Sequence, residues 1–373
     1  MMIRRRDFLL TGTAAAALRA QTAPRPRVES IVTISQQPEF YHGWATLAAR
    51  RNGELLVAYS GGRETHVCPF GRVELIRSRD GGRTWSWPEV LMDSPIDDRD
   101  AGVLETPSGS LLVTTFTSLA YESVLKSASG WDPQKLARWQ AVNLRSTPEQ
   151  RQALLGTWML RSTDGGMTWS APFRVPVNSP HGPVAVSGGR LIYAGKQLWQ
   201  PGQKVGVCES VDDGRSWRWL ADIPSRPGDT VVEYHELHAV EAADGRIIVH
   251  IRNHNPQNAG ETLQTESADG GKSFATPHPI GVWGLPSHLL RLRDGRLLMS
   301  YGYRRAPFGN QARISSDHGR TWSAPMVISD DGAGGDLGYP ATVELPDGQL
   351  LTVWYEALKS SPRAVLRQAR WQI

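Results

Sequence analysis

A short motif recurs five times along the chain, and it constrains the fold more than any other feature. The octapeptides SRDGGRTW, STDGGMTW, SVDDGRSW, SADGGKSF and SSDHGRTW begin at Ser78, Ser162, Ser210, Ser267 and Ser315. In each motif the Asp side chain can accept hydrogen bonds from its own turn, and the Gly can take a positive φ. Each motif therefore predicts the same hairpin turn, with its aromatic residue folded back over it.

A second pattern, a turn glycine followed by an apolar strand, recurs six times. The glycines are Gly53, Gly109, Gly189, Gly245, Gly295 and Gly348, with spacings of 56, 80, 56, 50 and 53 residues. A strand, a turn, a second strand and an Asp-bearing hairpin, repeated about every fifty residues, form the unit of a propeller blade. The sequence therefore predicts an all-β chain, a single six-bladed β-propeller over residues 28–373. The sixth unit lacks an Asp-bearing turn, and we expect its missing edge from residues 28–34 or 365–371.

The 80-residue spacing indicates a helical insertion in the second blade, between Phe116 and Trp158. Asp132 before Pro133, and the Ser-Thr-Pro-Glu run at 146–149, have the chemistry of helix starts. We expect two short helices, covering about 134–143 and 150–155. The insertion either packs on the flank of the propeller or forms a lid that brings aromatic side chains to a substrate.

The first twenty residues have the features of an export signal. Arg5 and Arg6 precede Phe8 and Leu9, and a run of small apolar residues follows. The paired arginines resemble a twin-arginine signal. This predicts a bacterial protein that is periplasmic or secreted, with residues 21–27 as a leader before the propeller domain.

Charge and composition exclude several classes of protein. The formal charge is +4, but outside residues 1–20 there are 37 basic and 36 acidic residues, so we expect no nucleic-acid partner. No run of 18 apolar residues is present, so we expect no membrane association once the signal is removed. Two cysteines cannot form a disulfide scaffold or a zinc ribbon. The chain has no phosphate loop, no Gly-x-Ser-x-Gly elbow and no cofactor motif.

The inner strand of each propeller blade begins at the central axis, so the residues just before each turn glycine mark a candidate site. Polar residues gather there and in the loops after the second strands. The candidates are His42, Arg63, His66, Arg99, Asp100, His181, Glu236, Arg252, Arg304 and Tyr339. We expect no metal at His235 and His238, because residues three apart on a strand face opposite sides.

Five Asp-bearing turns on a six-blade count resemble the sialidase (neuraminidase) superfamily over residues 28–373. Glu236 with Arg252 after it is similar to the family's glutamate and following arginine, and Tyr339 is similar to its catalytic tyrosine. The resemblance implies retaining glycoside cleavage, in which Tyr339 attacks the anomeric carbon and Glu236 takes its proton. It also implies arginines, here Arg252 and Arg304, that bind a substrate carboxylate.

Two positions depart from the family pattern. Sialidases have Arg-Ile-Pro on the first inner strand, whereas this chain has Tyr-His-Gly-Trp at 41–44. The third arginine is therefore missing, and His42 is the nearest basic group. The loop at 62–71 also lacks the family's acid/base aspartate, which leaves His66 or Asp100 as the proton carrier.

Taken together, these features predict an exported exo-glycosidase that removes terminal sialic acid or a related acidic sugar from glycans, without a cofactor. The expected catalytic residues are Tyr339, Glu236, His66 and Asp100. The expected substrate-binding residues are Arg63, Arg252, Arg304, His42, Arg99 and His181. Two alternatives stay open: a polysaccharide lyase or other glycosidase that uses His as acid/base, and a non-catalytic carbohydrate-binding propeller.

Overall fold

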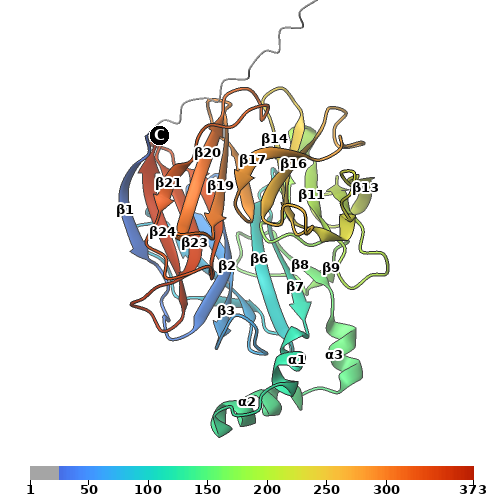
Figure 1. Cartoon of the computed structure of the whole chain (residues 1–373), viewed down its shortest axis with the longest axis vertical. Coiled ribbons are helices and arrows are strands. Elements are labelled where there is room, and N and C mark those ends of the chain that lie inside the picture. The colour runs from blue at the N-terminus through green and yellow to red at the C-terminus, as the bar shows by residue number, and fades with distance from the viewer. Residues whose placement is uncertain (1–24) are drawn as a thin grey trace, which may run out of the picture.

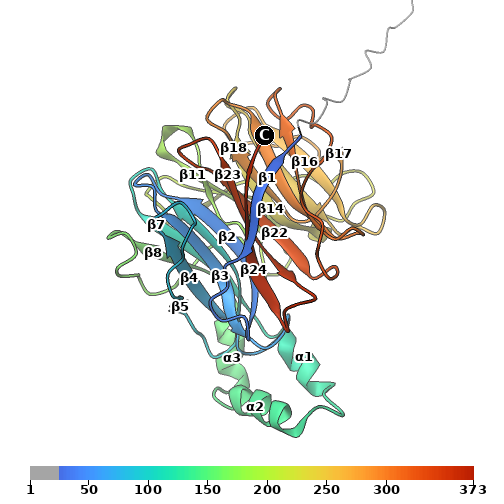
Figure 2. The ribbon, with the colours of Figure 1, turned by 90° about the vertical axis from the view of Figure 1, so that its left-hand side faces the viewer.

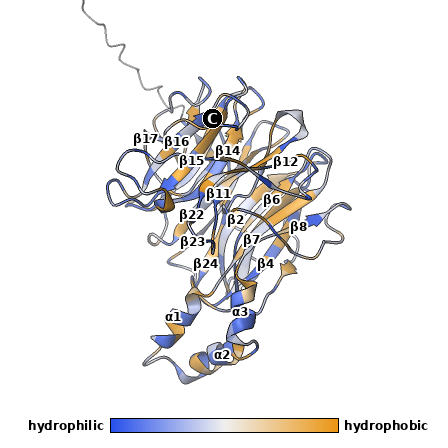
Figure 3. Cartoon of the chain, turned by 90° about the vertical axis from the view of Figure 1, so that its right-hand side faces the viewer, coloured by the Kyte–Doolittle hydropathy of each residue, from blue (hydrophilic) through white to orange (hydrophobic). Residues whose placement is uncertain are grey.

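The computed structural model describes residues 25–373, so the expected export signal and most of the leader lie outside it. These residues form six four-stranded antiparallel sheets arranged as the blades of a β-propeller (Figures 1 and 2). The predicted fold class is thereby confirmed. Figure 3 shows the apolar residues concentrated on the strands. Core clusters such as the one that contains Val57 and Val353 join neighbouring blades.

The blades follow one another in chain order, each beginning with its inner strand. The first contains β2 (Tyr41–Ala49), β3 (Leu55–Arg63), β4 (Arg72–Ser78) and β5 (Glu89–Met92). The second contains β6 (Asp97–Glu105), β7 (Leu111–Ser118), β8 (Thr157–Ser162) and β9 (Phe173–Arg174). The third contains β10 (Val184–Ala185), β11 (Leu191–Lys196), β12 (Val205–Ser210) and β13 (Arg218–Asp222).

The remaining blades repeat this order until the last one closes the ring. The fourth contains β14 (Tyr234–Glu241), β15 (Ile247–Asn253), β16 (Glu261–Ser267) and β17 (His278–Trp283). The fifth contains β18 (Ser287–Arg291), β19 (Leu297–Tyr303), β20 (Gly309–Ser315) and β21 (Met326–Ser329). The sixth contains β22 (Leu337–Glu344), β23 (Leu350–Ala357), β24 (Ala364–Gln372) and β1 (Arg27–Thr33).

The sixth blade is completed by the N-terminal strand. β1 pairs antiparallel with β24, with Val28 opposite Trp371 and Thr33 opposite Arg367. Both segments considered for the missing edge therefore enter this blade, β24 as its third strand and β1 as its outermost strand. The two ends of the described chain thus meet in one sheet, which closes the ring.

The Asp-bearing turns have the geometry that their sequence predicts. In the first, Asp80 accepts hydrogen bonds from the backbone nitrogens of Arg83 at 3.0 Å and Thr84 at 2.9 Å, and from the Thr84 hydroxyl at 2.6 Å. The other four turns repeat the bonds to the fourth residue after Asp. The Trp85 indole donates to Gln368 of the sixth blade at 2.9 Å. This turn therefore also ties the first blade to the sixth, its neighbour where the ring closes.

The insertion in the second blade forms three helices rather than the two expected. They are α1 (Ala120–Lys126), α2 (Pro133–Asn143) and α3 (Pro148–Leu154), and they project from one end of the propeller as an arm (Figures 1 and 2). Among residues 25–373, no helix is long and apolar enough to cross a membrane. The sequence prediction missed α1 because it starts after Leu119, which makes no side-chain cap. The other two helices carry the caps that identified them, Asp132 and Thr147.

The arm packs against the loop that follows β3. Trp139 on α2 is fully buried, and its indole nitrogen donates to Glu64 at 2.9 Å. Arg138 donates to the same carboxylate at 2.9 Å, and Phe70 packs on the Trp139 ring. Of the two roles considered for the insertion, the contacts of Trp139 favour packing, since this aromatic ring is not free to meet a ligand.

Candidate active site

Four residues near the start of the inner strands share a strained backbone conformation. Trp44, Asp100, Glu236 and Tyr339 have φ angles of 54°, 46°, 45° and 55°. The strand pairing slips by a bulge at each of them. Non-glycine residues rarely adopt positive φ, and such strain is concentrated at functional sites. The four residues lie on the first, second, fourth and sixth blades.

The same four residues share one position in the repeat. Each lies nine residues before the turn glycine of its blade: Gly53, Gly109, Gly245 and Gly348. In the third and fifth blades the equivalent residues are Pro180 and Pro286. A proline ring fixes φ at a negative value, so these two blades cannot form the same bulge. The repeat thus supplies a positive-φ inner-strand residue to the axial site from four of its six blades.

Tyr339, Glu236 and Arg252 form the centre of the site. The Tyr339 hydroxyl donates to Glu236 Oε1 at 2.5 Å, and Arg252 Nη1 donates to Glu236 Oε2 at 2.5 Å. The same Nη1 atom lies 3.3 Å from the Tyr339 oxygen. The sequence placed Tyr339 on the sixth blade and Glu236 and Arg252 on the fourth, and the structure brings them together.

Charge and burial fix the resting protonation of this group. Burial and the neighbouring Glu236 charge raise the pKa of Tyr339 well above its usual value. Burial would also raise the pKa of Glu236, but the Arg252 charge and the hydrogen bonds from Tyr339 and Arg252 hold it below its usual value. Tyr339 is therefore a neutral phenol that donates to a carboxylate, which is the arrangement a tyrosine nucleophile and its base require.

Asp100 adds a second carboxyl group with a different protonation. Its side chain is 6% exposed, and burial and the Glu236 charge raise its pKa to about 7. Near neutral pH it therefore carries a proton for a substantial part of the time. Two carboxyl groups with pKa values driven apart can take opposite roles in acid and base chemistry.

Of the two adjacent arginines after β19, Arg304 faces this group. Its guanidinium carbon lies 5.9 Å from the centre of the Tyr339 ring, and its Nε donates to Leu337 O at 3.0 Å. Arg305 instead stacks on Trp283, 3.1 Å from the ring centre, and is exposed. The bond to Leu337 leaves the two terminal nitrogens of Arg304 as the donors for a ligand.

Arg99 lies on the first blade's side of the site, where the third arginine is missing from the sequence. Trp44, on the inner strand of that blade, is 1% exposed. The Arg99 guanidinium carbon lies 4.3 Å from the centre of the Trp44 ring, within the range of a cation–π contact. Within residues 25–373, the other contacts of Arg99 are long, at 3.3 Å to His66 O and 3.5 Å to Asp97.

His66 lies at the more open side of the site, in the loop after β3. Its side chain is 44% exposed. Its Nδ1 atom lies 3.0 Å from Asp336 Oδ1 and 2.8 Å from the Tyr41 hydroxyl. The hydroxyl of Tyr355 also donates to Asp336, at 3.2 Å, and the Tyr355 ring lies 5.8 Å from that of Tyr339. A hydrogen-bonded network therefore connects His66 to the wall beside the tyrosine.

The structure does not support the substrate-binding roles expected for Arg63 and His42. Arg63 is fully buried and makes a two-point ion pair with Asp97, at 2.5 and 3.0 Å. It also donates to His66 O at 2.8 Å. The Arg63 guanidinium is therefore engaged in holding this loop and is not available to a substrate. His42 is fully buried with Nδ1 2.7 Å from Ser35 Oγ, and burial, aided by a nearby arginine charge, lowers its pKa to about 4.

His181 also differs from its expected role as a substrate contact. It is 2% exposed and packs among His238 and His288, with ring centres 5.3 and 5.1 Å away. Burial and the neighbouring His288 hold the pKa of His181 well below its usual value, so the ring is neutral. All three rings line a cavity of about 740 Å³ at the opposite end of the axis, bordered by the far ends of the inner strands. His181 therefore lies beneath the Tyr339 layer, with ring centres 6.4 Å apart.

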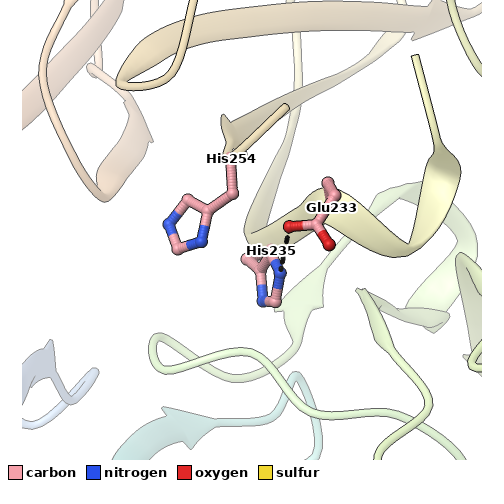
Figure 4. Close-up of side chains that lie close together, drawn as sticks. All are labelled: Glu233, His235 and His254. Atoms are coloured by element: carbon pink, nitrogen blue, oxygen red, sulfur yellow. Dashed lines mark ion pairs between the residues drawn. The ribbon is translucent and has the colours of Figure 1, made fainter. Parts of the chain in front are cut away.

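One group among residues 25–373 brings together atoms that could hold a metal ion: Glu233, His235 and His254 (Figure 4). Their ligand atoms lie within 4.8 Å of one another. The two rings are stacked, however, with planes 28° apart, so their lone pairs do not converge. The Lys196 ammonium lies 3.5 Å from His235 Nε2 and adds a competing positive charge. The group does not fit a divalent cation in this arrangement, and we assign no metal to it.

Sequence reasoning missed four residues of the site: Trp44, Tyr41, Tyr355 and Asp336. Trp44 had a usable signal, because it shares the nine-residue spacing to a turn glycine with Asp100, Glu236 and Tyr339. Tyr355 had one too, because it follows its turn glycine by seven residues, as Arg252 does. Tyr41 and Asp336 had none. Asp336 follows a glycine-rich loop and reaches His66 across 270 residues of sequence, which no local pattern indicates.

Comparison with known proteins agrees with this fold. Residues 139–352 match the family model of the BNR repeat-like domain. A curated sialidase from Micromonospora viridifaciens is 25% identical over 342 residues, 81% of this chain, and the chain spans only 48% of that protein's length. A solved protein of unknown function from Dyadobacter fermentans has a TM-score of 0.76 at 22% identity, covering 94% of this chain and 100% of that one.

The NanB sialidase from Streptococcus pneumoniae has a TM-score of 0.65 at 15% identity, covering 93% of this chain and 71% of that one. These likenesses at low identity show the shared propeller fold. The family match covers more than half of the chain, so the protein belongs to the BNR repeat-like domain family, as a divergent, sialidase-like member.

Proposed function

We propose that this protein is an exo-glycosidase of the sialidase type, which hydrolyses terminal sialic acid or a related acidic sugar from glycans. The observation that carries the proposal is the hydrogen bond from Tyr339 to Glu236, with Arg252 within hydrogen-bond distance of both. Sialidases among the similar proteins support the same reaction class.

In the proposed first step, the Tyr339 oxygen forms a bond to the anomeric carbon while the bond to the leaving oxygen breaks. The Tyr339 proton passes to Glu236 Oε1, along the 2.5 Å hydrogen bond already present. A neutral nucleophile suits a substrate with a carboxylate beside the reacting carbon, because a carboxylate nucleophile would be repelled. In the second step water attacks the same carbon, and Tyr339 regains its proton from Glu236.

Arg252, Arg304 and Arg99 are the proposed partners of the substrate carboxylate. Arg304 has both terminal nitrogens available for two-point binding, and Arg252 lies against the nucleophile and its base. Arg99, held on the Trp44 ring, offers a third positive charge where the first blade lacks the expected arginine. This set binds an anionic sugar and discriminates against a neutral one.

The two proton carriers proposed from the sequence, Asp100 and His66, differ in how far they are exposed to solvent. Asp100 is 6% exposed, in the same layer as Tyr339, whereas the His66 side chain is 44% exposed at the open side. An exo-enzyme buries the terminal sugar and leaves the rest of the glycan toward solvent. Asp100 therefore suits a hydroxyl of the buried ring, and His66 suits the leaving oxygen.

The test is an assay of the purified protein on a sialoside and on uronate-containing polysaccharides. Release of free sialic acid by the wild-type protein, and its loss in Glu236→Gln, supports the proposal. Formation of an unsaturated uronate, detected by its ultraviolet absorbance, would instead identify a lyase. Binding of both glycans without any product would identify a carbohydrate-binding propeller.

We also propose that residues 1–20 direct export through the twin-arginine pathway to the periplasm or beyond. The support is the pair Arg5 and Arg6 followed by Phe8 and Leu9. Replacing both arginines with Lys should retain the protein in the cytoplasm of a bacterial host, whereas Arg19→Lys should not. Unchanged export of the double variant contradicts this proposal.

A further inference from the structure

An acidic side chain that the family resemblance does not provide for lies directly behind His66. Asp336, just before β22, has one carboxylate that accepts hydrogen bonds from three aromatic side chains. His66 Nδ1 lies 3.0 Å from Oδ1, the Tyr41 hydroxyl lies 2.9 and 3.1 Å from the two oxygens, and the Tyr355 hydroxyl lies 3.2 Å from Oδ1. These partners come from the first and sixth blades.

This network determines which nitrogen of His66 carries the hydrogen. Burial alone would raise the pKa of Asp336, but the contacts with His66, Tyr41 and Tyr355 hold it below its usual value, so it is an ionised acceptor. The Tyr41 hydroxyl donates to this carboxylate, and its oxygen is left to accept from His66 at 2.8 Å. Both neighbours of Nδ1 therefore act as acceptors, which places the hydrogen on Nδ1 and leaves Nε2 for a ligand.

The backbone of His66 is fixed as well. Its carbonyl accepts from Arg63 at 2.8 Å and from Arg99 at 3.3 Å, and Arg63 is itself held by Asp97. The His66 ring also packs edge-on against Trp44, with ring centres 4.9 Å apart. A partly exposed imidazole is thus held in one orientation, beside the strained inner-strand residue of the first blade.

We propose that Asp336 is the positioning residue of a His66–Asp336 dyad, and that this dyad serves as acid and base where a lone carboxylic acid would be expected. The inference rests on the proposed glycosidase function. In the first step the doubly protonated His66 ring gives its Nε2 proton to the leaving oxygen as Tyr339 bonds to the anomeric carbon, which leaves the neutral Nδ1–H form. In the second step Nε2 takes a proton from the attacking water. Asp336 stays ionised and stabilises the doubly protonated ring.

Leaving-group dependence tests the dyad. An acid is needed far more by a poor leaving group, so the probes are methyl and 4-nitrophenyl α-sialosides. Both His66→Ala and Asp336→Asn should lower kcat/KM for the methyl sialoside at least about a hundredfold, and for the 4-nitrophenyl sialoside much less. Asp331→Asn, in the same loop but paired with Arg367, should leave both values unchanged.

Asp100→Asn separates the two proton carriers. It should lower kcat/KM for both sialosides by the same factor, because Asp100 is assigned to the buried ring. Equal losses in Asp336→Asn on the two probes, or a leaving-group dependence that appears in Asp100→Asn instead, would overturn the proposal.

A spectroscopic readout distinguishes failure of the dyad from failure of the proposed function. The ¹⁵N shifts of the neutral His66 ring should report the Nδ1–H form in the wild-type protein, and a shift toward the Nε2–H form in Asp336→Asn. This holds even when neither sialoside is cleaved. A wild-type ring in the Nε2–H form contradicts the dyad, whatever the activity.

Discussion

The Tyr339 hydroxyl lies 2.5 Å from the Glu236 carboxylate, although the two residues are 103 positions apart and belong to the sixth and fourth blades. Both have positive φ at a bulge of the inner strand. The strained backbone at these two residues therefore helps to orient the Tyr339 phenol and the Glu236 carboxylate toward each other across the axis.

The first prediction concerns this pair. Tyr339→Phe removes the attacking oxygen and leaves the ring, so kcat should fall by about a thousandfold or more while the thermal midpoint changes little. Tyr301→Phe is the control, since Tyr301 is equally buried but its hydroxyl contacts Gln311 and Arg313, away from the site. Near-normal turnover of Tyr339→Phe would show that the tyrosine only packs against the sugar.

The second prediction uses the adjacent arginines as a matched pair. Arg304→Lys should raise KM for an acidic sugar by about tenfold or more, because Lys cannot reproduce two-point binding of a carboxylate. Arg305→Lys should leave KM unchanged, because Arg305 stacks on Trp283. Steady-state kinetics on an acidic sugar and a neutral analogue measure both effects. Equal KM changes in the two variants would remove Arg304 from the substrate site.

The third prediction links Asp100 to stability. Its folded-state pKa of about 7 lies above the value of about 3.9 expected in the unfolded chain. Between these values the folded state binds more protons, so this group's contribution to the free energy of unfolding falls as pH rises from about 4 to 7. Asp100→Asn removes that loss. The free energy of unfolding of the variant minus that of the wild type should therefore be larger at pH 8 than at pH 4, by up to about 4 kcal/mol.

Urea titrations at the two pH values measure this difference. Burial also raises the pKa of Asp98, to about 8. Asp98 therefore also lowers the free energy of unfolding of the wild-type protein as pH rises. The comparison is therefore between variant and wild type at each pH rather than between pH values alone. If both proteins lose the same stability from pH 4 to pH 8, Asp100 is not the buried acid described here.

The parts of this protein that repeat are the parts that its sequence predicts. Each hairpin turn is specified by local hydrogen bonds, so the sequence is enough to identify Asp80 and its four counterparts. The number of turn glycines gives the number of blades. The same period locates the site, because Trp44, Asp100, Glu236 and Tyr339 all precede a turn glycine by nine residues. Pro180 and Pro286 at the two remaining positions explain why only four blades contribute an inner-strand residue of this kind.

What the sequence could not predict depends on contacts between distant segments. Arg63 and Arg252 have similar positions near the end of a second strand, yet Arg63 is paired with Asp97 whereas Arg252 faces the nucleophile. Nothing in the sequence separates them, since the pairing of a buried charge is decided by the neighbouring blade. Helix α1 was missed for a local reason, because Leu119 gives no cap.

The last prediction concerns closure of the ring by β1, whose two neighbouring side chains provide a matched test. Ile31 packs against the core shared by the fifth and sixth blades, whereas Val32 points outward and is 44% exposed. Ile31→Ala should lower the free energy of unfolding by about 1–3 kcal/mol because it removes buried apolar contacts, and Val32→Ala should change it by less than about 0.5 kcal/mol. Removing residues 1–34 should lower stability further and expose the edge of β24 to pairing with a second chain. Denaturant unfolding and size-exclusion chromatography measure the two effects. A monomer of unchanged stability without β1 would show that the sixth blade is held by its other three strands alone.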